Sequence, residues 1–317
     1  MGAAWRWTIW ASLAASAPLA AQSSPTREYT VQQPPEVVTP PGETQDIAFR
    51  VDRDDRMTVP VRLSGSGPFR FLVDTGANRT VVSTALGAAL GLASGPVAKL
   101  HSVSGTSMVR TALVPRLELG RDRVRNVEAA LLEAAHMGAD GIVGVDSLRS
   151  EKVIFDFRKR LISIVPGKRR ARVEPGTIVV SGKLKQGHLI VTSATANRVP
   201  LMAVLDTGSE ITMGNAALRG RLEARGRLGP PERFAMKSVT GEVLFGEAFH
   251  LKKVTVGDVE LHDLVVLFTS APIFQRLGLE DRPALLLGMN ALRAFDQVSI
   301  DFVRKQLRMT IAGARQR

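Results

Sequence analysis

After about residue 45, short apolar and β-branched runs alternate with turns rich in Gly, Asn and Pro. Such runs are typical of β-strands, and helical periodicity is limited to short pieces such as residues 84–92. The pattern therefore predicts an all-β protein with a few short helices. The clearest predicted strands are Met57–Leu63, Phe71–Val73, Thr177–Val180, His188–Thr192, Leu201–Leu205 and Leu261–Phe268.

The predicted strands recur in the same order in two halves of the chain. An apolar run leads into Asp-Thr-Gly at Asp74 and again at Asp206. Each copy continues with a Ser-Val-Ser/Thr-Gly turn, an apolar-apolar-Gly stretch and a closing pair of strands. The spacing between equivalent motifs grows slowly, as loop insertions in a duplicated unit would cause. We predict two homologous β-barrel lobes, residues 46–167 and 173–313, related by a pseudo-two-fold axis.

The residues before the first lobe have a different composition. Arg6, an apolar stretch from Ile9 to Leu19 and a small-residue site at Ala20 predict a signal peptide over residues 1–21. The alternative is an uncleaved membrane anchor, although the stretch is short for a bilayer span of ~20 residues. Five prolines within residues 22–45 predict an extended tether. We expect export to the periplasm or beyond, without stable membrane insertion if the signal is cut.

Composition narrows the possible chemistry. The chain has 317 residues and no cysteine, which excludes disulfides, cysteine-ligated metals and thiol nucleophiles. Its five histidines show no metal-ligand spacing, so no metal and no cofactor are expected.

The net charge is +12, with basic runs at residues 158–160 and in a predicted connector at residues 168–172. No aromatic platform accompanies these runs, so we expect solvated charges and no nucleic-acid partner.

The repeated Asp-Thr-Gly carries the candidate chemistry. A single Asp before Gly is usually a turn residue, but two copies with matching companions predict that Asp74 and Asp206 meet. Two carboxylates in contact cannot both ionise, so the pair would hold one proton. The ionised member could then activate water while the other donates to a substrate carbonyl. Asp74 and Asp206 are the predicted catalytic residues.

The neighbours of both aspartates have predicted supporting roles. Thr75 and Thr207 would brace the two turns across the axis, and the glycines would let the backbone approach the carboxylates. Ser209 follows the second triplet where Ala77 follows the first, and its hydroxyl could donate to Asp206. That would make Asp206 the more acidic partner, leaving the proton more often on Asp74. The predicted supporting residues are Thr75, Gly76, Ala77, Thr207, Gly208 and Ser209.

Two further pairs of positions complete the predicted site. Gly144 and Gly288 would pass behind the Asp turns, where a β-carbon would collide. The tips of two polar hairpins are candidate flaps that fold over a substrate. These flap candidates are Ser104 and Gly105 in the first half and Thr240 and Gly241 in the second.

These motifs together resemble the pepsin–retropepsin superfamily of aspartic proteases, and most closely exported bacterial members with two retropepsin-like lobes in tandem. The proton-sharing carboxylate pair is itself the established property of that class. The resemblance implies a bilobal fold, a cleft between the lobes and metal-free endopeptidase activity on a protein or peptide substrate. Pepsin's flap tyrosine has no counterpart, because Tyr29 is the only tyrosine. The motifs carrying the resemblance are residues 74–77, 206–209, 144–148, 288–292, 155–157 and 300–302.

Several alternatives stay open at this point. The chain could be an inactive peptide-binding protein of the same fold, or each lobe could pair with a lobe of another chain rather than act within a monomer. A serine hydrolase is disfavoured because Ser64 and Ser66 lack a strand–elbow–helix context. A phosphate loop at residues 176–183 is disfavoured because Leu184 stands where Ser or Thr would bind magnesium.

Overall fold

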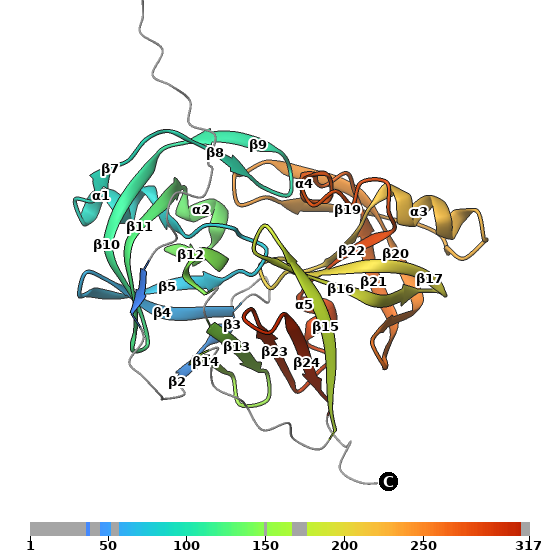
Figure 1. Ribbon diagram of the computed structural model, residues 1–317. Coiled ribbons are helices and arrows are strands. Elements are labelled where there is room, and N and C mark those ends of the chain that lie inside the picture. Colours follow the sequence, from blue (N-terminus) through green and yellow to red (C-terminus); the bar gives the residue numbers. More distant parts are fainter. Residues whose placement is uncertain (1–35, 39–44, 52–56, 149–150, 167–175, 312–317) are drawn as a thin grey trace, which may run out of the picture.

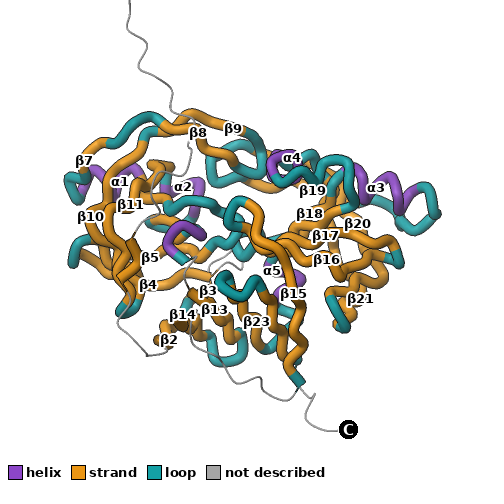
Figure 2. The backbone as a smooth tube through the Cα atoms, viewed as in Figure 1, coloured by secondary structure: helices purple, strands orange, loops and turns teal. Residues whose placement is uncertain are grey.

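The computed structural model describes residues 36–38, 45–51, 57–148, 151–166 and 176–311 (Figure 1). The predicted signal peptide, most of the predicted tether and the basic connector at residues 168–172 lie outside these residues. Strands dominate the described chain and the helices are short, as Figure 2 shows. The two lobes lie side by side, and the all-β, bilobal prediction is confirmed.

The first lobe is built on a nine-stranded sheet, and a separate hairpin projects over one end. Its sheet consists of β1 (Glu36–Val38), β3 (Arg50–Val51), β4 (Met57–Leu63), β5 (Ser66–Val73), β6 (Val81–Ser83), β7 (Ala93–Ser94), β10 (Thr111–Leu119), β11 (Asp122–Leu132) and β12 (Gly141–Val143). The hairpin is β8 (Ala98–His101) with β9 (Thr106–Val109). The helices are α1 (Thr84–Ala89), α2 (Ala134–Met137) and the 3-10 turn η1 (Val145–Ser147).

The second lobe repeats this arrangement with longer strands. Its strands are β15 (Thr177–Lys185), β16 (His188–Ala196), β17 (Val199–Leu205), β18 (Thr212–Gly214), β19 (Glu232–Lys237), β20 (Val243–Val256), β21 (Val259–Phe268) and β22 (Ala284–Leu287). Its helices are α3 (Ala216–Glu223), α4 (Pro272–Arg276) and α5 (Met289–Leu292). In both lobes the strand before the Asp pairs in parallel with the later apolar strand, β5 with β12 and β17 with β22.

A shared sheet joins the two lobes below the site. Each repeat closes on a hairpin, β13 (Glu151–Asp156) with β14 (Leu161–Pro166) and β23 (Gln297–Asp301) with β24 (Gln306–Thr310). The hairpins pair with each other through β13 and β23, while β2 (Gln45–Ala48) and β15 flank them. The sequence predicted both hairpins but not their joining. The ladder fixes the lobes relative to each other because its hydrogen bonds cross from one lobe to the other.

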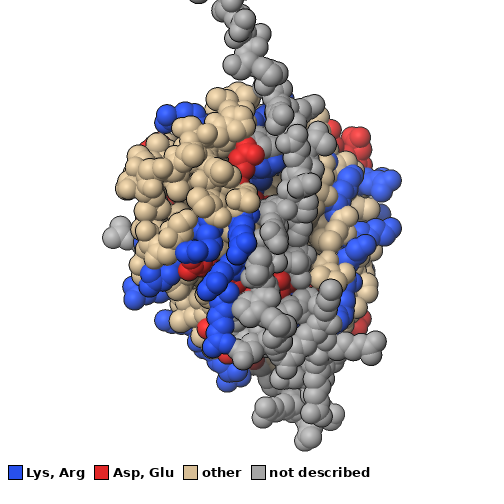
Figure 3. All heavy atoms as spheres, turned by 60° about the vertical axis from the view of Figure 1, so that its left-hand side comes forward, with Lys and Arg blue, Asp and Glu red and all other residues tan. Residues whose placement is uncertain are grey.

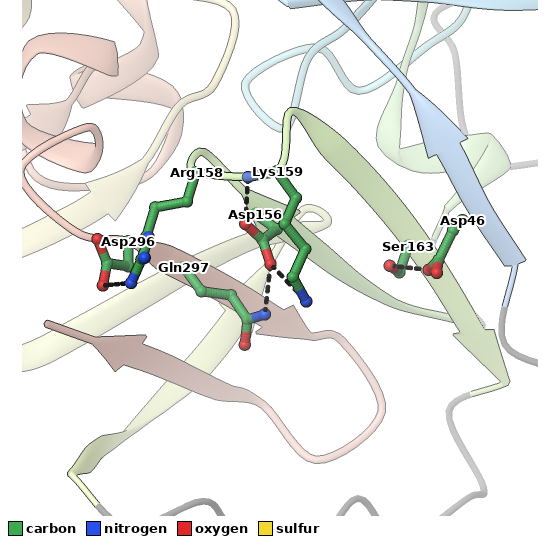
Figure 4. A network of polar contacts seen from close by, with 7 residues as sticks. All are labelled: Asp46, Asp156, Arg158, Lys159, Ser163, Asp296 and Gln297. Carbon is green, nitrogen blue, oxygen red and sulfur yellow. Dashed lines mark hydrogen bonds and ion pairs between the residues drawn. The ribbon is translucent and has the colours of Figure 1, made fainter. Parts of the chain in front are cut away.

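Polar contacts reinforce this junction (Figure 4). Arg158, in the β13–β14 turn, lies 3.5 Å from the Asp296 carboxylate of the other repeat. Lys159 lies 3.6 Å from Asp156, whose carboxylate also accepts from Gln297 at 3.5 Å. The basic run at residues 158–160 is exposed, as predicted, and exposed pairs of this kind stabilise by about 0–1 kcal/mol each.

Alternating burial explains why these segments form half-buried strands. In β4, Val59, Val61 and Leu63 are buried while Pro60 and Arg62 are exposed, the period-two pattern of a sheet with one face on the core. The strands β12 and β22 are buried at every position, because they lie at the centre of their lobes. A single large apolar cluster then runs through both lobes and the shared sheet.

The positive charge lies on the outer surface. Blue Lys and Arg side chains are prominent on the face that is at the left of Figure 1 (Figure 3). Exposed arginines of the first lobe occupy the outward positions of β4, β10 and β11 and the turn between the last two. They are Arg62, Arg116, Arg121, Arg123 and Arg125.

Candidate active site

The two aspartates occupy equivalent ends of the central strands. Asp74 follows β5, and its backbone N–H donates to the Val143 carbonyl of β12 at 3.1 Å. Asp206 follows β17, and its N–H donates to the Leu287 carbonyl of β22 at 3.0 Å. Parallel pairing thus holds both Asp turns at the carboxyl ends of buried strands, which fixes where each carboxylate points.

The two Asp turns are locked together by their threonines. The Thr75 N–H donates to the Thr207 hydroxyl at 3.0 Å, and the Thr207 N–H donates to the Thr75 hydroxyl at 3.1 Å. Each hydroxyl also donates into the other lobe, Thr75 to the Leu205 carbonyl at 3.2 Å and Thr207 to the Val73 carbonyl at 2.8 Å. All four bonds are buried and cross the pseudo-two-fold axis, as predicted for these threonines.

This interlock brings each glycine against the carboxylate of the opposite turn. A β-carbon added at Gly76 would lie 2.5 Å from Cγ of Asp206, and one at Gly208 would overlap the Asp74 carboxylate. Each carboxylate also accepts from its own turn, Asp74 from the Gly76 N–H at 2.7 Å and Asp206 from the Gly208 N–H at 2.9 Å. The structure therefore brings Asp74 and Asp206 together, and only glycine fits beside them.

Gly144 and Gly288 pass behind the Asp turns. Their added β-carbons would lie 2.6 Å from the Arg79 and Ile211 carbonyl oxygens, too close for any side chain. The residue after each glycine donates its N–H into the Asp loop, Val145 to Ala77 and Met289 to Ser209, both at 2.8 Å. Backbone hydrogen bonds thus clamp each loop from behind.

A polar pair that the sequence analysis did not predict supports each loop. Thr80 donates from its N–H and hydroxyl to the Asp146 carboxylate at 3.1 and 2.8 Å. Thr212 donates likewise to the Asn290 amide oxygen at 2.8 and 2.7 Å. The repeated threonine, six residues after each Asp, and the Asp/Asn two residues after each glycine were visible signals, but their pairing required the fold.

Burial differs between the two aspartates. Asp206 is buried with 5% exposure, whereas Asp74 is partly exposed to the cleft. Burial raises the pKa of Asp206 well above its usual range, and the neighbouring Asp74 carboxylate adds to the rise. The direction of this shift runs against the prediction that Asp206 is the more acidic partner, because burial favours the neutral form of a carboxyl group.

The predicted role of the Ser209 hydroxyl is also corrected. The hydroxyl donates to the Ile211 carbonyl at 2.8 Å, within its own loop, and not to Asp206. The Ser209 backbone N–H is the group that acts on the Asp206 carboxylate, just as the Ala77 N–H donates to Asp74 at 3.0 Å. The side chain at this position therefore stabilises the loop rather than tuning the acid.

The two predicted flap hairpins meet above the aspartates. The Ser104 and Thr240 hydroxyl oxygens are 3.4 Å apart, and both hydroxyls donate to the Glu242 carboxylate. Each tip reaches the opposite lobe: Val103 packs against an apolar cluster of the second lobe, and Val239 packs against one of the first. Crossed in this way, the hairpins β8–β9 and β19–β20 form a roof (Figure 1).

Beneath this roof lies a cleft of about 1480 Å³ lined by Asp74, Asp206 and residues of both lobes and both hairpins. Small-molecule pockets are usually about 300–1,000 Å³, so this cleft has room for several residues of an extended peptide. Its walls are mixed, with apolar residues such as Leu132 and Ile273 beside charged ones such as Arg276.

A polar cluster around the buried His188, on one side of the cleft, was not predicted. His188 is fully buried, and burial followed by the nearby Arg276 guanidinium lowers the pKa of His188 to about 4. With its amide oriented to suit its neighbours, Asn78 donates to Nε2 of this neutral ring and to the Gln186 carbonyl at 3.0 Å. The Asn78 amide oxygen accepts a hydrogen bond from Arg276. The cluster ties the first Asp loop to the second lobe.

Two β lobes whose Asp-Thr-Gly turns interlock beneath paired hairpins define a bilobal acid-protease fold. Consistent with this class, the chain matches the family described as aspartyl protease over residues 59–147 and 192–291. The match includes both Asp turns and more than half of the sequence, and the chain belongs to this aspartyl protease family. A search among curated proteins found no match.

The described residues include no helix with the length and hydropathy needed to cross a bilayer. Residues 1–35, which hold the predicted signal or anchor, lie outside this statement because the structure does not describe them.

Proposed function

We propose that the protein is an aspartic endopeptidase that hydrolyses peptide bonds with a water molecule activated between Asp74 and Asp206. The observation that carries this proposal is the reciprocal interlock of the two turns, which sets the carboxylates against each other beside Gly76 and Gly208. Membership of the aspartyl protease family supports the same reaction class. A cleft of about 1480 Å³ suits a peptide rather than a small substrate.

The difference in burial supports the following order of proton transfers. Asp206, whose pKa is raised, holds the shared proton, and Asp74 is the ionised partner. Asp74 takes a proton from water as the water oxygen bonds to the substrate carbonyl carbon, and Asp206 donates its proton to the carbonyl oxygen. The resulting tetrahedral diol is neutral, and the carboxylate pair still holds one proton.

Breakdown of the diol returns the two aspartates to their starting protonation states. Asp74 gives its proton to the amide nitrogen, the carbon–nitrogen bond breaks, and one diol hydroxyl returns a proton to Asp206. The products are a carboxylic acid and an amine, with no net proton change on the enzyme. General acid–base assistance of this kind contributes about 10²–10⁴-fold in rate. The crossed hairpins must open to admit a peptide and close to exclude water.

We further propose that the enzyme works as a monomer and is exported to the periplasm or secreted. Both halves of the proposed site lie in one chain, so no second copy is needed. The export proposal rests on the sequence of residues 1–21 alone. Solution mass and the N-terminal sequence of the mature protein would test these two points.

The decisive experiment compares the full-length protein with Asp74→Asn and Asp206→Asn on a denatured protein mixture and a peptide library. We expect both variants to lose at least about 10²-fold in kcat/KM, because an amide can neither accept the water proton nor share one. A statine-type transition-state mimic should inhibit the wild type and a chelator should not. Cleavage that survives in both variants would reject the mechanism, and binding without cleavage by the wild type would indicate a peptide-binding protein.

A further inference from the structure

The cleft contains a cation that the proposed chemistry does not use. Arg276, the last residue of α4, lines the cleft and is only partly exposed. It lies on the side occupied by the hairpin of the first lobe and by Asn78, four residues beyond Asp74. A guanidinium here can reach a bound peptide close to the reacting bond.

The partners of Arg276 in the described structure are neutral. Its guanidinium donates to the Asn78 amide oxygen and, at 3.4 Å, to the Gln186 amide oxygen. The Gln186 amide in turn donates to the Arg276 backbone carbonyl at 3.2 Å, which holds the segment in place. No carboxylate among the described residues forms an ion pair with Arg276. A guanidinium has five donors, so these two acceptors leave capacity for a planar anion.

The surroundings add positive charge. Lys99 and His101 of β8 also line this side of the cleft, and Lys99 is exposed. Burial lowers the pKa of His101, and the positive charges of Arg276 and Lys99 lower it further. The two cations therefore lie close to the same imidazole ring. Burial likewise lowers the pKa of Arg276, the response of a cation that is partly desolvated without an anion beside it.

The pseudo-symmetric position in the first lobe differs. There α2 places His136 against the opposite hairpin, where a β-carbon at Gly241 would overlap the imidazole ring. Both side chains line the cleft, but α2 contributes a histidine packed against the roof whereas α4 contributes a guanidinium, so the two sides of the cleft differ in charge. This inequality gives a bound peptide a preferred direction.

We infer that Arg276 is a specificity-determining residue that binds a carboxylate of the peptide substrate, namely an Asp or Glu side chain at one position beside the scissile bond. This inference rests on the proposed peptidase function, but its test measures binding and does not require cleavage. A carboxylate would replace the water around a half-buried cation with bidentate hydrogen bonds, which gives both affinity and geometric selectivity.

The test measures binding to the full-length Asp74→Asn protein, so that the result does not depend on turnover. Acetylated, amidated octapeptides carry a single Glu or Gln moved through each position, and a second series carries a free C-terminal carboxylate. We expect Glu to bind about 10- to 100-fold more tightly than Gln at one position, because a charged pair of this kind forms stronger hydrogen bonds than an amide does. A preference for the free C-terminus alone would overturn the assignment to a side chain.

Three further substitutions assign the preference to Arg276. In Arg276→Gln the ratio of Glu to Gln affinity should fall to about one, in Arg276→Lys it should be partly retained, and in Arg276→Glu it should reverse toward Lys-containing peptides. Arg221→Gln is the matched control, because it removes the same charge from an exposed position on α3. A Glu preference that persists in Arg276→Gln, or none in the Asp74→Asn protein, would overturn the inference.

Wild-type cleavage of the same peptides separates the two proposals. Cleavage without an acidic preference would overturn the role of Arg276 and leave the peptidase proposal intact. Selective binding without cleavage would support the role of Arg276 and reject the peptidase proposal.

Discussion

The two lobes are close copies in backbone but not in electrostatics. Behind the first Asp loop, Thr80 donates to a carboxylate, Asp146, whereas behind the second, Thr212 donates to an amide, Asn290. Of the two central aspartates, Asp206 is buried and Asp74 is partly exposed. The two lobes therefore share one backbone arrangement but differ in the side chains behind the Asp loops and in the burial of the central aspartates. In the proposed mechanism, this difference gives two residues of the same type opposite proton-transfer roles.

We expect the largest effect from a methyl group added to either glycine beside the carboxylates, because it would force the two aspartates apart. Gly76→Ala would push on Asp206, which is buried, and Gly208→Ala would push on Asp74, which is partly exposed to the cleft. We expect at least about 10²-fold loss of kcat/KM in both, with the larger loss in Gly76→Ala, since misplacements near 1 Å have such effects.

Gly220→Ala is the control for this pair. Its added β-carbon on α3 would have nothing within 4 Å, and alanine favours a helix interior by about 1 kcal/mol. Peptidase assays with thermal unfolding would check all three variants. Full activity in Gly76→Ala would mean that the two carboxylates need not meet.

The next test removes one half of the threonine interlock. Thr75→Val and Thr207→Val keep the side-chain shape but leave a carbonyl of the opposite lobe and an N–H without their partners. Each buried group left unpaired costs about 1–3 kcal/mol, so denaturant unfolding should show a clear loss of stability. Because the bonds are reciprocal, we expect the two variants to lose similar amounts.

Serine at either threonine position is the matched control, because it retains the hydroxyl. Strongly unequal losses in the two valine variants would show that one lobe alone carries the interlock.

A third test exchanges the residues behind the loops. Burial raises the pKa of Asp146, so its contribution to stability is present at acid pH and is lost as the pH rises through the raised pKa. Asp146→Asn should therefore gain stability relative to the wild type at pH near 7 but not near 4. Urea unfolding at the two pH values measures this difference.

The mirror variant, Asn290→Asp, should lose stability on the same rise in pH. Its new carboxylate would also replace the amide that donates to the Val265 carbonyl at 2.9 Å. An Asp146→Asn difference that does not change with pH would show that Asp146 does not titrate differently in the folded and unfolded chains.

The smallest expected effect concerns the residue after each Asp-Thr-Gly. Ser209→Ala removes the hydroxyl that donates to the Ile211 carbonyl, a loss of about 1 kcal/mol in stability. The acidic limb of the pH–rate profile should not move, because the hydroxyl does not contact Asp206. Ala77→Ser in the first lobe is the reciprocal variant. A shift of the acidic limb in Ser209→Ala would restore the tuning role that the sequence suggested.

Much of the fold and of the candidate site was predictable because the relevant signals are local. Alternating apolar residues identify strands such as β4, whose predicted and observed bounds coincide at Met57 and Leu63. The duplicated Asp-Thr-Gly predicts two equivalent turns. The glycines behind these turns predict a close backbone approach. Their pairing across the axis followed from the repeat. The supporting pair Asp146 and Thr80 was missed, because neither residue is unusual by itself.

The sequence by itself determined that the chain holds two copies of one β unit, each with a carboxylate turn at the same place. The tertiary structure alone decided that the closing hairpins join in one sheet, that the roof hairpins cross to opposite lobes, and that Arg276 faces the cleft. It also decided which aspartate is buried. The reason is physical: strand period and turn chemistry depend on neighbouring residues, whereas burial and charge proximity depend on packing between residues far apart in the chain.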